Sequence, residues 1–379
     1  MGTRISELDG LRAIAVASVI GSHYRVLAAH FARVTHFGLA GVDIFFVLSG
    51  FLITSILLRM KTTARPYRTF YARRIRRIFP PYYLLLAAVL GAAALSGETP
   101  SRSAWYYVCF LSSLTGTSAA IHRAGAVLTG QVGVYSLLGH SVLPASQVGD
   151  LPVSIGGCLT HLWSLSVEEW FYVIWAPLVL TASRALIAIA IVLITVAAFL
   201  LRCLGFDDNS WYFMFVCRLD TLAVGAALAL WYSRRGEVSE RTRRRGDAIV
   251  SAAAVAAALL LLALLVRIRP VLGHEIRCSP LFAAFGTPLI GIATAGAIAW
   301  ILRHQSSPHP LCRVLRSRPM AFVGTVSYTV YLVHVPMYYF ATKLVPGSDW
   351  LSSGLAILLS LTVAAASWKY IESPLLSRG

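Results

Sequence analysis

The sequence predicts an all-α protein: a polytopic bundle of about ten transmembrane helices with both termini in the cytoplasm. Of its 379 residues, 57% are hydrophobic and only 13% are charged, which is about half of the roughly 25% charged residues found in soluble domains. The apolar residues form long runs that short, arginine-rich segments separate. Runs of about 20 apolar residues are long enough to cross a membrane as helices. The composition therefore favours a membrane protein over a soluble one.

Ten segments have the length and apolar content of membrane spans. They are residues 8–30, 38–59, 79–96, 160–181, 184–201, 211–232, 247–267, 281–303, 319–342 and 350–371. Basic residues gather in segments 60–78, 233–246 and 303–318, which share one side of the membrane in this arrangement. Because cytoplasmic loops are enriched in Lys and Arg, we expect that side to be the cytoplasm. The first span follows no signal-peptide pattern, so we expect it to be retained.

Residues 97–159 do not fit this pattern. Segment 103–116 is apolar and aromatic but short for a span, and the rest is rich in Gly and Ser. We expect an extracytoplasmic or partly re-entrant cap over the bundle. The whole of residues 1–379 is expected to form a single membrane domain with no fused soluble domain.

The net charge of +17 does not indicate a nucleic-acid partner. The basic residues lie between apolar spans rather than on a free helix with interleaved aromatic residues. The chain also has no HExxH, no paired CxxC and no P-loop, so neither a metal site nor a nucleotide-driven mechanism is expected.

Arg12 and His23 lie in the first predicted span, eleven positions apart. Eleven positions are about three helical turns, so the two side chains share a face and lie about 16 Å apart along the axis. Ionisable groups inside a membrane usually face a bundle interior or a wet cavity. A neutral imidazole there is suited to act as a general base. The structural alternative is a packed polar residue hydrogen-bonded to a neighbouring helix.

Asp43 lies near the outer start of the second span, in GVDIFFVLSGFLIT. Because this position is near the level of His23 in the membrane, Asp43 is predicted to orient the imidazole of His23 or to form an ion pair with it. Gly41, Ser49 and Gly50 in the same segment are small residues that allow close helix approach. The alternative is helix packing with an interfacial carboxylate.

Four arginines, Arg73, Arg74, Arg76 and Arg77, cluster where the chain enters the third predicted span. Guanidinium groups suit phosphate oxygens, so an anionic, nucleotide-like donor arriving from the cytoplasm would meet them first. An anchor at the cytoplasmic surface or a contact with anionic lipids is the alternative, and the residues alone favour it.

The segment HLWSLSVEEWFYVIWAPL places His161, Ser164, Glu168 and Tyr172 on one helix face, with Glu169 beside it. Two adjacent carboxylates in an apolar helix are costly unless they are used or paired. They are candidates to orient the histidine of the first span, to balance its arginine, or to bind an acceptor hydroxyl; His161 is a candidate for binding substrate. The alternative is a buried ion pair that holds the bundle together.

The segment GTVSYTVYLVHVP places Ser327, Tyr331 and His334 on one face. A structural role is favoured for them, with substrate binding by Tyr331 and His334 as the functional alternative. Arg218 and Asp220 are predicted to form a structural pair.

Taken together, these segments resemble the membrane-bound acyltransferase 3 family over essentially the whole chain. The resemblance rests on LDGLRAIAV with the following SH, on GVDIFFVLSGFLIT, the arginine cluster, HLWSLSVEEWFY and VSYTVYLVHVP, and on the closing YIESP. The family's Arg and His separated by ten residues match Arg12 and His23, and its acidic motif matches Glu168 and Glu169. Its arginine motif, associated with donor binding, matches the cluster.

The resemblance implies an O-acyltransferase of the bacterial plasma membrane that uses cytoplasmic acyl-CoA, usually acetyl-CoA, and binds no permanent cofactor. The acceptor is expected to be a hydroxyl of a carbohydrate or glycan, or of a small molecule such as a macrolide antibiotic. We expect the arginine cluster to dock the CoA phosphates and His23, near mid-membrane, to promote direct transfer rather than to become acylated. The alternative class is a proton-coupled transporter of a sugar or lipid-linked solute, because intramembrane Arg, His and Glu also mark proton relays.

Overall fold

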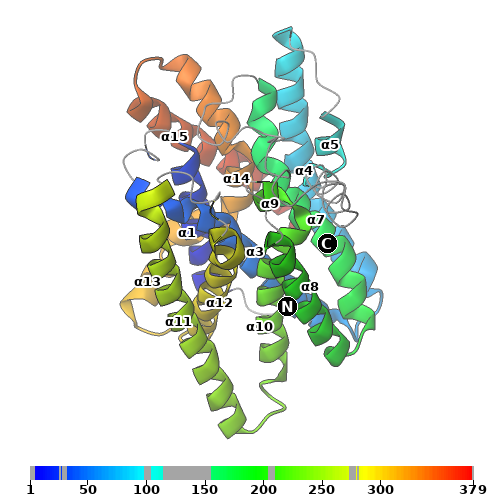
Figure 1. The fold of residues 1–379 in the computed structure, drawn as a ribbon. Coiled ribbons are helices and arrows are strands. Elements are labelled where there is room, and N and C mark those ends of the chain that lie inside the picture. The colour runs from blue at the N-terminus through cyan, green and yellow to red at the C-terminus, as the bar shows by residue number, and fades with distance from the viewer. Residues whose placement is uncertain are drawn as a thin grey trace, which may run out of the picture.

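A computed structural model describes residues 5–24, 27, 32–97, 104–113, 155–203, 210–272, 279 and 281–377. All regular structure in this part of the chain is helical, which confirms the all-α class (Figure 1). The long helices are α1 (Ser6–His23), α3 (Ala32–Met60), α4 (Pro66–Leu95), α7 (Trp163–Thr181), α8 (Arg184–Cys203), α10 (Phe215–Arg234), α11 (Glu240–Leu272), α12 (Thr287–Arg303), α14 (Arg318–Leu344) and α15 (Asp349–Ser367).

Short helical segments lie between or beside the long helices. They are α5 (Ala104–Val108), the 3₁₀-helix η3 (Ile155–Leu162), α9 (Ser210–Phe213), the π-helix η5 (Phe282–Gly286), α13 (Pro310–Leu315), the π-helix η6 (Trp368–Glu372) and α16 (Ser373–Ser377). The five-residue α5 is far shorter than a membrane span. Most of the predicted cap, residues 97–159, lies outside the described residues.

Each predicted span overlaps one of the ten long helices. Eight helices of the described part are long and apolar enough to cross a membrane, so the protein is a multi-pass membrane protein. The other two long helices, α1 and α7, carry buried or partly buried polar residues, among them Asp9 and Glu168. They pack against α3 and its neighbours, so the helices that carry the candidate site residues lie in the interior of the bundle.

Two predicted boundaries are wrong, and both corrections concern candidate site residues. The first span was expected to run to residue 30, but α1 ends at His23 and Tyr24 adopts an extended conformation. The third span was expected to begin at residue 79, but α4 is continuous from Pro66 through Pro80 and Pro81. Buried residues on both sides of the two prolines hold this helix in the bundle despite the missing backbone donors. The arginine cluster therefore lies on a helix rather than in a loop.

The centre of the bundle is formed by a close crossing of α3 and α10. A Cβ atom on Gly50 would lie 2.0 Å from the carbonyl oxygen of Leu222, and one on Gly225 would lie 2.1 Å from that of Val47. Gly41 makes a similar approach to α1, where an added Cβ would lie 2.7 Å from the carbonyl oxygen of Ala15. The predicted role of Gly41 and Gly50 in close helix approach is confirmed.

Gly50→Ala is expected to destabilise the protein by about 1–3 kcal/mol, the usual cost of overpacking a well-packed interior. The added methyl group meets backbone rather than a flexible side chain, so two helices must separate to admit it. Thermal unfolding in detergent, followed by size-exclusion chromatography, measures this effect. The matched control is Gly91→Ala in α4, where an added Cβ meets nothing within 4 Å. An equal fall in the melting temperature of both variants would contradict the prediction.

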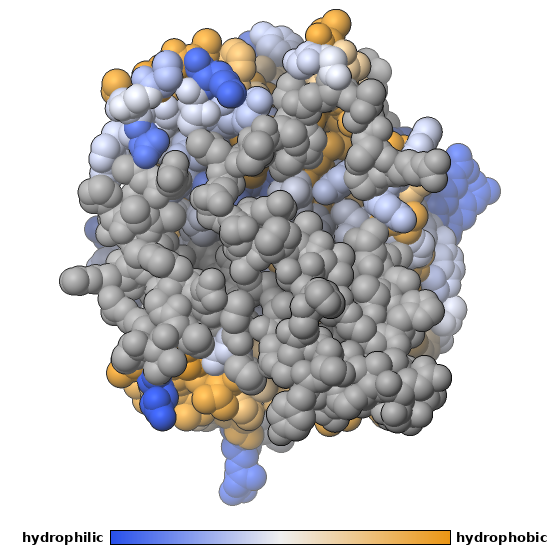
Figure 2. Space-filling model, turned by 45° about the horizontal axis from the view of Figure 1, so that its top comes forward, coloured by the Kyte–Doolittle hydropathy of each residue, from blue (hydrophilic) through white to orange (hydrophobic). Residues whose placement is uncertain are grey.

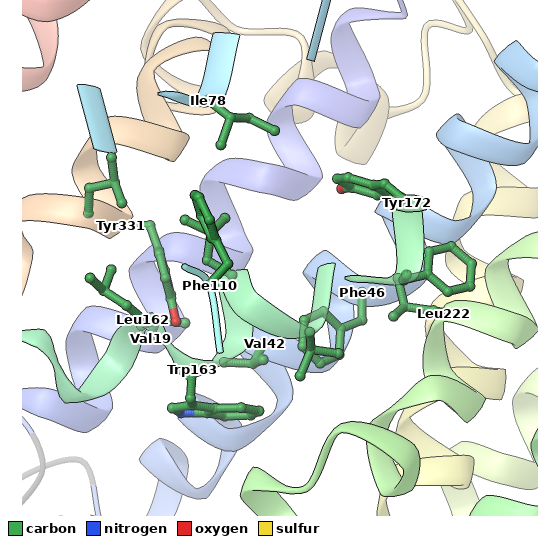
Figure 3. Packing of buried hydrophobic residues seen from close by; sticks show 14 of the residues in the cluster. Val19, Val42, Phe46, Ile78, Phe110, Leu162, Trp163, Tyr172, Leu222 and Tyr331 are labelled. Atoms are coloured by element: carbon green, nitrogen blue, oxygen red, sulfur yellow. The ribbon is translucent and has the colours of Figure 1, made fainter. Parts of the chain in front are cut away.

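The buried core gathers side chains from most of the long helices. Figure 3 shows Val19 of α1, Phe46 of α3, Trp163 of α7 and Tyr331 of α14 in one cluster. In contrast, α8 and α11 expose rows of large apolar residues such as Leu193, as expected for helices that face lipid. Apolar side chains also reach the rim of the face shown in Figure 2.

Candidate active site

Three histidines from three different elements meet inside the bundle. His23 is the last residue of α1, His161 lies in η3, and His334 lies in α14, ten residues before its end. The ring centroids of His23 and His334 are 5.0 Å apart, and those of His334 and His161 are 4.8 Å apart. His161 and His334 are fully buried, whereas His23 is partly exposed. His23 thus lies at the end of its helix but within the bundle, at the accessible end of the histidine cluster.

Backbone carbonyls fix the tautomer of each imidazole, because a carbonyl can only accept a hydrogen bond. Nδ1 of His23 lies 2.8 Å from the carbonyl oxygen of Val19, and Nδ1 of His334 lies 2.6 Å from that of Tyr331. In the neutral rings both Nδ1 atoms therefore carry the proton and both Nε2 atoms carry the lone pair. His161 has the opposite arrangement, because its Nε2 lies 3.1 Å from the carbonyl oxygen of Leu332. A lone pair on Nε2 of His23 is what a general base requires.

Tyr331 joins the histidine cluster to a small cavity. Its ring lies 5.5 Å from those of both His161 and His334. Its hydroxyl donates to the carbonyl of His161 at 2.8 Å and lies 2.5 Å from the hydroxyl of Ser164. Two predicted groupings are therefore confirmed: Tyr331 lies beside His334, and Ser164 lies beside His161.

The inner cavity, as we call this space, has a volume of about 100 Å³ and lies between α1, α3, α4, α7 and α14. Its polar lining includes Arg12, Ser49, Arg74, Arg77, Glu168 and Tyr331. Three guanidinium groups and one carboxylate thus face one small cavity, which Tyr331 joins to the histidines. The inner cavity brings together residues from five helices that are far apart in the sequence.

The two adjacent glutamates of α7 have different surroundings. Glu168 lines the inner cavity and accepts hydrogen bonds from the hydroxyls of Ser49 at 2.8 Å and Tyr172 at 3.0 Å. Glu169 lines neither this cavity nor the larger one described below, and its Oε1 is buried with no hydrogen-bond partner in the described part of the chain. Of the two glutamates, Glu168 is therefore the one that lines the inner cavity beside its cations.

The four arginines of the cluster also have different surroundings, because they lie on two different faces of α4. Arg74 and Arg77, three positions apart, share a helix face and line the inner cavity. Arg73 is exposed and Arg76 partly so, and neither lines this cavity. The guanidinium of Arg74 also lies 5.4 Å from the ring centroid of Tyr172, which fixes it beside Glu168. The sequence treated these arginines as one group, but the structure brings only two of them to the site.

A second cavity, which we call the vestibule, opens where the ends of α1, α3, α8 and α10 meet. It has a volume of about 810 Å³, and its lining includes Arg12, Phe51, Arg59, Lys61, Arg184 and Tyr232. Arg12 lines both cavities and is bonded to Asp9 at 2.8 Å. The guanidinium of Arg12 therefore stands between the vestibule and the inner cavity.

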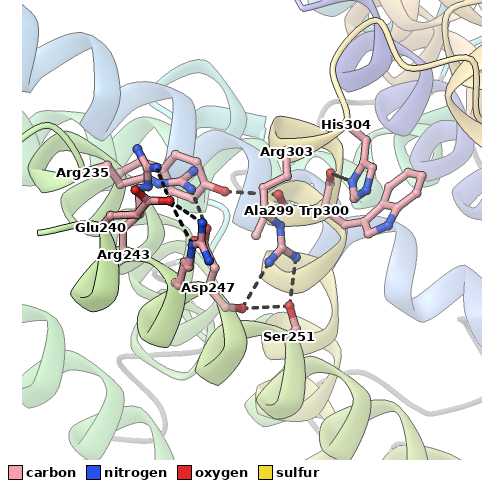
Figure 4. A network of polar contacts seen from close by, with 11 residues as sticks. Arg235, Glu240, Arg243, Asp247, Ser251, Ala299, Trp300, Arg303 and His304 are labelled. Atoms are coloured by element: carbon pink, nitrogen blue, oxygen red, sulfur yellow. Dashed lines mark hydrogen bonds and ion pairs between the residues drawn. The ribbon is translucent and has the colours of Figure 1, made fainter.

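A polar network supports the wall of the vestibule on the side of α10, α11 and α12 (Figure 4). The hydroxyl of Tyr232 donates to the carbonyl of Ala299 at 3.1 Å, and Arg235 pairs with Asp247 at 2.5 Å. Arg303 of α12 reaches back to the backbone carbonyl of Asp247 at 3.2 Å. The ends of these three helices are thus tied together, which confirms that segments 233–246 and 303–318 meet at one end of the bundle.

Asp43 does not contact His23, so the predicted pairing of these two residues is wrong. Its carboxylate is fully buried and accepts from Arg218 at 2.6 Å, while Asp220 accepts from Arg202 at 2.6 Å. The predicted pair of Arg218 with Asp220 is wrong for the same reason, because each residue is paired with a different helix. Breaking a buried pair by removing one partner typically costs about 3–5 kcal/mol. These contacts give Asp43 a role in holding α3 against α10, at a distance from the imidazole it was expected to orient.

Glu372, in the closing YIESP segment, is a buried carboxylate that the sequence did not single out. It accepts from the hydroxyls of Thr329 at 2.7 Å and Ser367 at 3.0 Å, and its Oε2 is buried with no partner in the described part. The π-helix η6 that carries it packs against α4, the helix of Arg77. The signals in the sequence were its place in the YIESP motif and a carboxylate at the end of an apolar span.

Comparison with known proteins gives the chain a family. The model of the acyltransferase domain of the acyltransferase 3 family matches residues 5–369. The peptidoglycan O-acetyltransferase OatA of Listeria monocytogenes is 28% identical over 391 aligned residues, which cover 99% of this chain and 56% of that protein. The putative peptidoglycan O-acetyltransferase YrhL of Bacillus subtilis is 29% identical over 390 residues, covering 99% of this chain and 55% of that protein.

The O-acetyltransferase OatA of Staphylococcus aureus is 28% identical, over 98% of this chain and 57% of its own length. This chain therefore spans little more than half the length of these relatives. No solved structure matches it. Because the family match covers nearly the whole sequence and the helices carry its motifs into one bundle, the chain belongs to the acyltransferase 3 family.

Proposed function

We propose that this protein is an integral membrane O-acyltransferase that moves an acyl group, usually acetyl, from acyl-CoA to a hydroxyl group of a carbohydrate or glycan. The observation that carries this proposal is the position of the histidine cluster directly beyond a cation-lined inner cavity. The names of the relatives, O-acetyltransferases of peptidoglycan among them, support a glycan acceptor. We place the protein in the bacterial plasma membrane, with the vestibule facing the cytoplasm.

In the reaction, His23 is the catalytic residue. Its Nε2 takes the proton of the acceptor hydroxyl as the oxygen bonds to the thioester carbonyl carbon. The carbon–sulfur bond then breaks, and the imidazolium returns the proton to the thiolate. The products are the acyl ester and the free thiol of CoA, so no external acid or base is consumed.

Arg12 has a positioning role in this scheme. Eleven helical positions separate it from His23, or about 16 Å along the axis, so its guanidinium does not reach the reacting carbonyl. It lies instead where the donor passes from the vestibule into the inner cavity. Arg12 therefore guides the donor, and Arg74 and Arg77 line the rest of its path.

The test is to incubate purified protein in detergent with acetyl-CoA and a panel of hydroxyl acceptors, including glycan fragments and macrolides. We expect free thiol to appear together with an equal amount of acyl ester, and only when a suitable acceptor is present. Thiol release is followed with a thiol reagent and the ester by mass spectrometry. Absence of both CoA binding and thiol release, together with solute uptake into proteoliposomes, would instead indicate a transporter.

A further inference from the structure

The proposed function leaves open where the nucleotide end of the donor binds. The inner cavity, at about 100 Å³, is far smaller than the roughly 300–1,000 Å³ of pockets that bind drug-sized ligands. It has room for a thin arm but not for an adenine nucleotide. The vestibule, at about 810 Å³, lies within the range for a larger ligand. The size of the two cavities thus separates the site of the arm from the site of the nucleotide.

The charge of the vestibule is suited to phosphate groups. Arg59 and Lys61 line it at the end of α3. Arg59 forms no hydrogen bond or ion pair with another described residue, and Lys61 donates to the neutral carbonyl of Ala182 at 2.5 Å. Arg184 adds a third cation, which is paired with the exposed Glu237 at 2.5 Å. Four cations thus line the vestibule: Arg12 is paired with Asp9 and Arg184 with Glu237, whereas Arg59 and Lys61 have no carboxylate partner in the described part.

The rest of the vestibule is suited to a flat heteroaromatic base. Phe51 and Tyr232 line it with edge-to-face rings whose centroids are 6.3 Å apart. The hydroxyl of Tyr232 is held by the carbonyl of Ala299, so the ring has a fixed position. Leu8, Leu52 and other apolar side chains complete the lining. An apolar, partly aromatic lining and nearby cations are suited to the two parts of an adenine nucleotide, its base and its phosphates.

We propose that the vestibule binds the adenosine 3′-phosphate 5′-diphosphate end of acyl-CoA, through Arg59, Lys61 and Arg184, with the pantetheine arm passing Arg12 into the inner cavity. This inference rests on the proposed function, and it assigns the CoA phosphates to the end of α3 rather than to the arginine cluster of α4. The thioester then lies on the side of the inner cavity nearest Tyr331 and the histidines. Anionic lipid headgroups carry the same phosphate chemistry, so the experiment must distinguish the two sources.

The test measures binding of CoA, dephospho-CoA and adenosine 3′,5′-bisphosphate to the purified full chain in neutral detergent, by calorimetry at low salt. We expect Arg59→Ala and Lys61→Ala each to weaken CoA binding about tenfold, the usual effect of one charge-assisted hydrogen bond. The double variant is expected to bind CoA still more weakly, because two of the three cations proposed to hold its phosphates are gone. The control is Arg313→Ala, an exposed arginine on α13 that lines neither cavity.

Three results would overturn the inference. Unchanged CoA binding by the double variant, with normal binding by the wild type, would place the nucleotide elsewhere and leave the proposed function intact. Competition by phosphatidylglycerol in nanodiscs without any binding of adenosine 3′,5′-bisphosphate would make the vestibule a lipid site. If the wild type binds neither CoA nor the bisphosphate and releases no thiol from acetyl-CoA, the proposed function fails as well.

Discussion

His23→Ala is expected to lower kcat for acyl transfer by about 10²–10⁴-fold, the range for loss of a general base, while CoA binding stays unchanged. The reason is that His23 and the proposed CoA site in the vestibule are separate. His23 lies beyond the inner cavity, against His334, and it does not line the vestibule. The measurement is thiol release with a saturating acceptor, beside calorimetric CoA binding by the same preparation.

The control for this variant is His304→Ala. His304 caps the end of α12, and its Nδ1 lies 2.9 Å from the carbonyl oxygen of Trp300, four residues earlier. This is the same local arrangement as His23 with Val19, but His304 lines neither cavity. Equal losses of activity in both variants would indicate a general structural effect and would remove the basis for His23 as the catalytic residue.

The same preparations distinguish direct transfer from an acyl-histidine intermediate. Direct transfer predicts no thiol release from acetyl-CoA when the acceptor is omitted. An intermediate predicts a burst of thiol equal to the enzyme concentration and a mass increase on the peptide that carries His23. We expect the first result, in line with the proposed role of His23 as a general base.

The helices themselves were predictable from the sequence, because each apolar run is long enough to cross a membrane. Their ends were less so. The sequence contains no Gly or Pro after His23 that would end α1 there, and the apolar pattern continues to residue 30. In α4 the helix is longer than the predicted span: it begins at Pro66 rather than at residue 79, and Ile78 and Tyr82 are buried on either side of Pro80 and Pro81.

The sequence predicted which site residues share a face of one helix, but it did not predict which helices bring their site residues together. Periodicity placed Tyr331 with His334 on α14, yet it could not place them against His23. Asp43 shows the limit most clearly, because a carboxylate at the right depth can face either of two neighbours, and its partner Arg218 lies 175 positions away. The role of the vestibule cations could not be predicted for another reason. Basic residues at a helix end, such as Arg59 and Lys61, have the same sequence pattern as residues that only anchor the cytoplasmic end of a span.

Glu168→Gln is expected to lower kcat about tenfold or more, equivalent to about 1.4 kcal/mol of transition-state stabilisation, with little change in the Kd for CoA. The carboxylate is the only acidic group among the residues that line the inner cavity, where Arg12, Arg74 and Arg77 also lie. It accepts from two hydroxyls, and an amide can accept through only one of its two terminal atoms. Loss of the charge and of one hydrogen bond leaves Arg74 and Arg77 without a carboxylate in the lining of the inner cavity, because Arg12 is paired with Asp9.

The matched comparison is Glu169→Gln, the same chemical change one position along α7. Because Glu169 lines neither cavity, its replacement is expected to cost much less activity than that of Glu168. Glu168→Asp, which keeps the charge, is expected to recover part of the lost kcat, and a purely structural role would not predict this recovery. A larger loss from Glu169→Gln than from Glu168→Gln would show that the acidic motif acts through the side of α7 that faces away from the inner cavity. Balancing the cavity arginines would then not be its role.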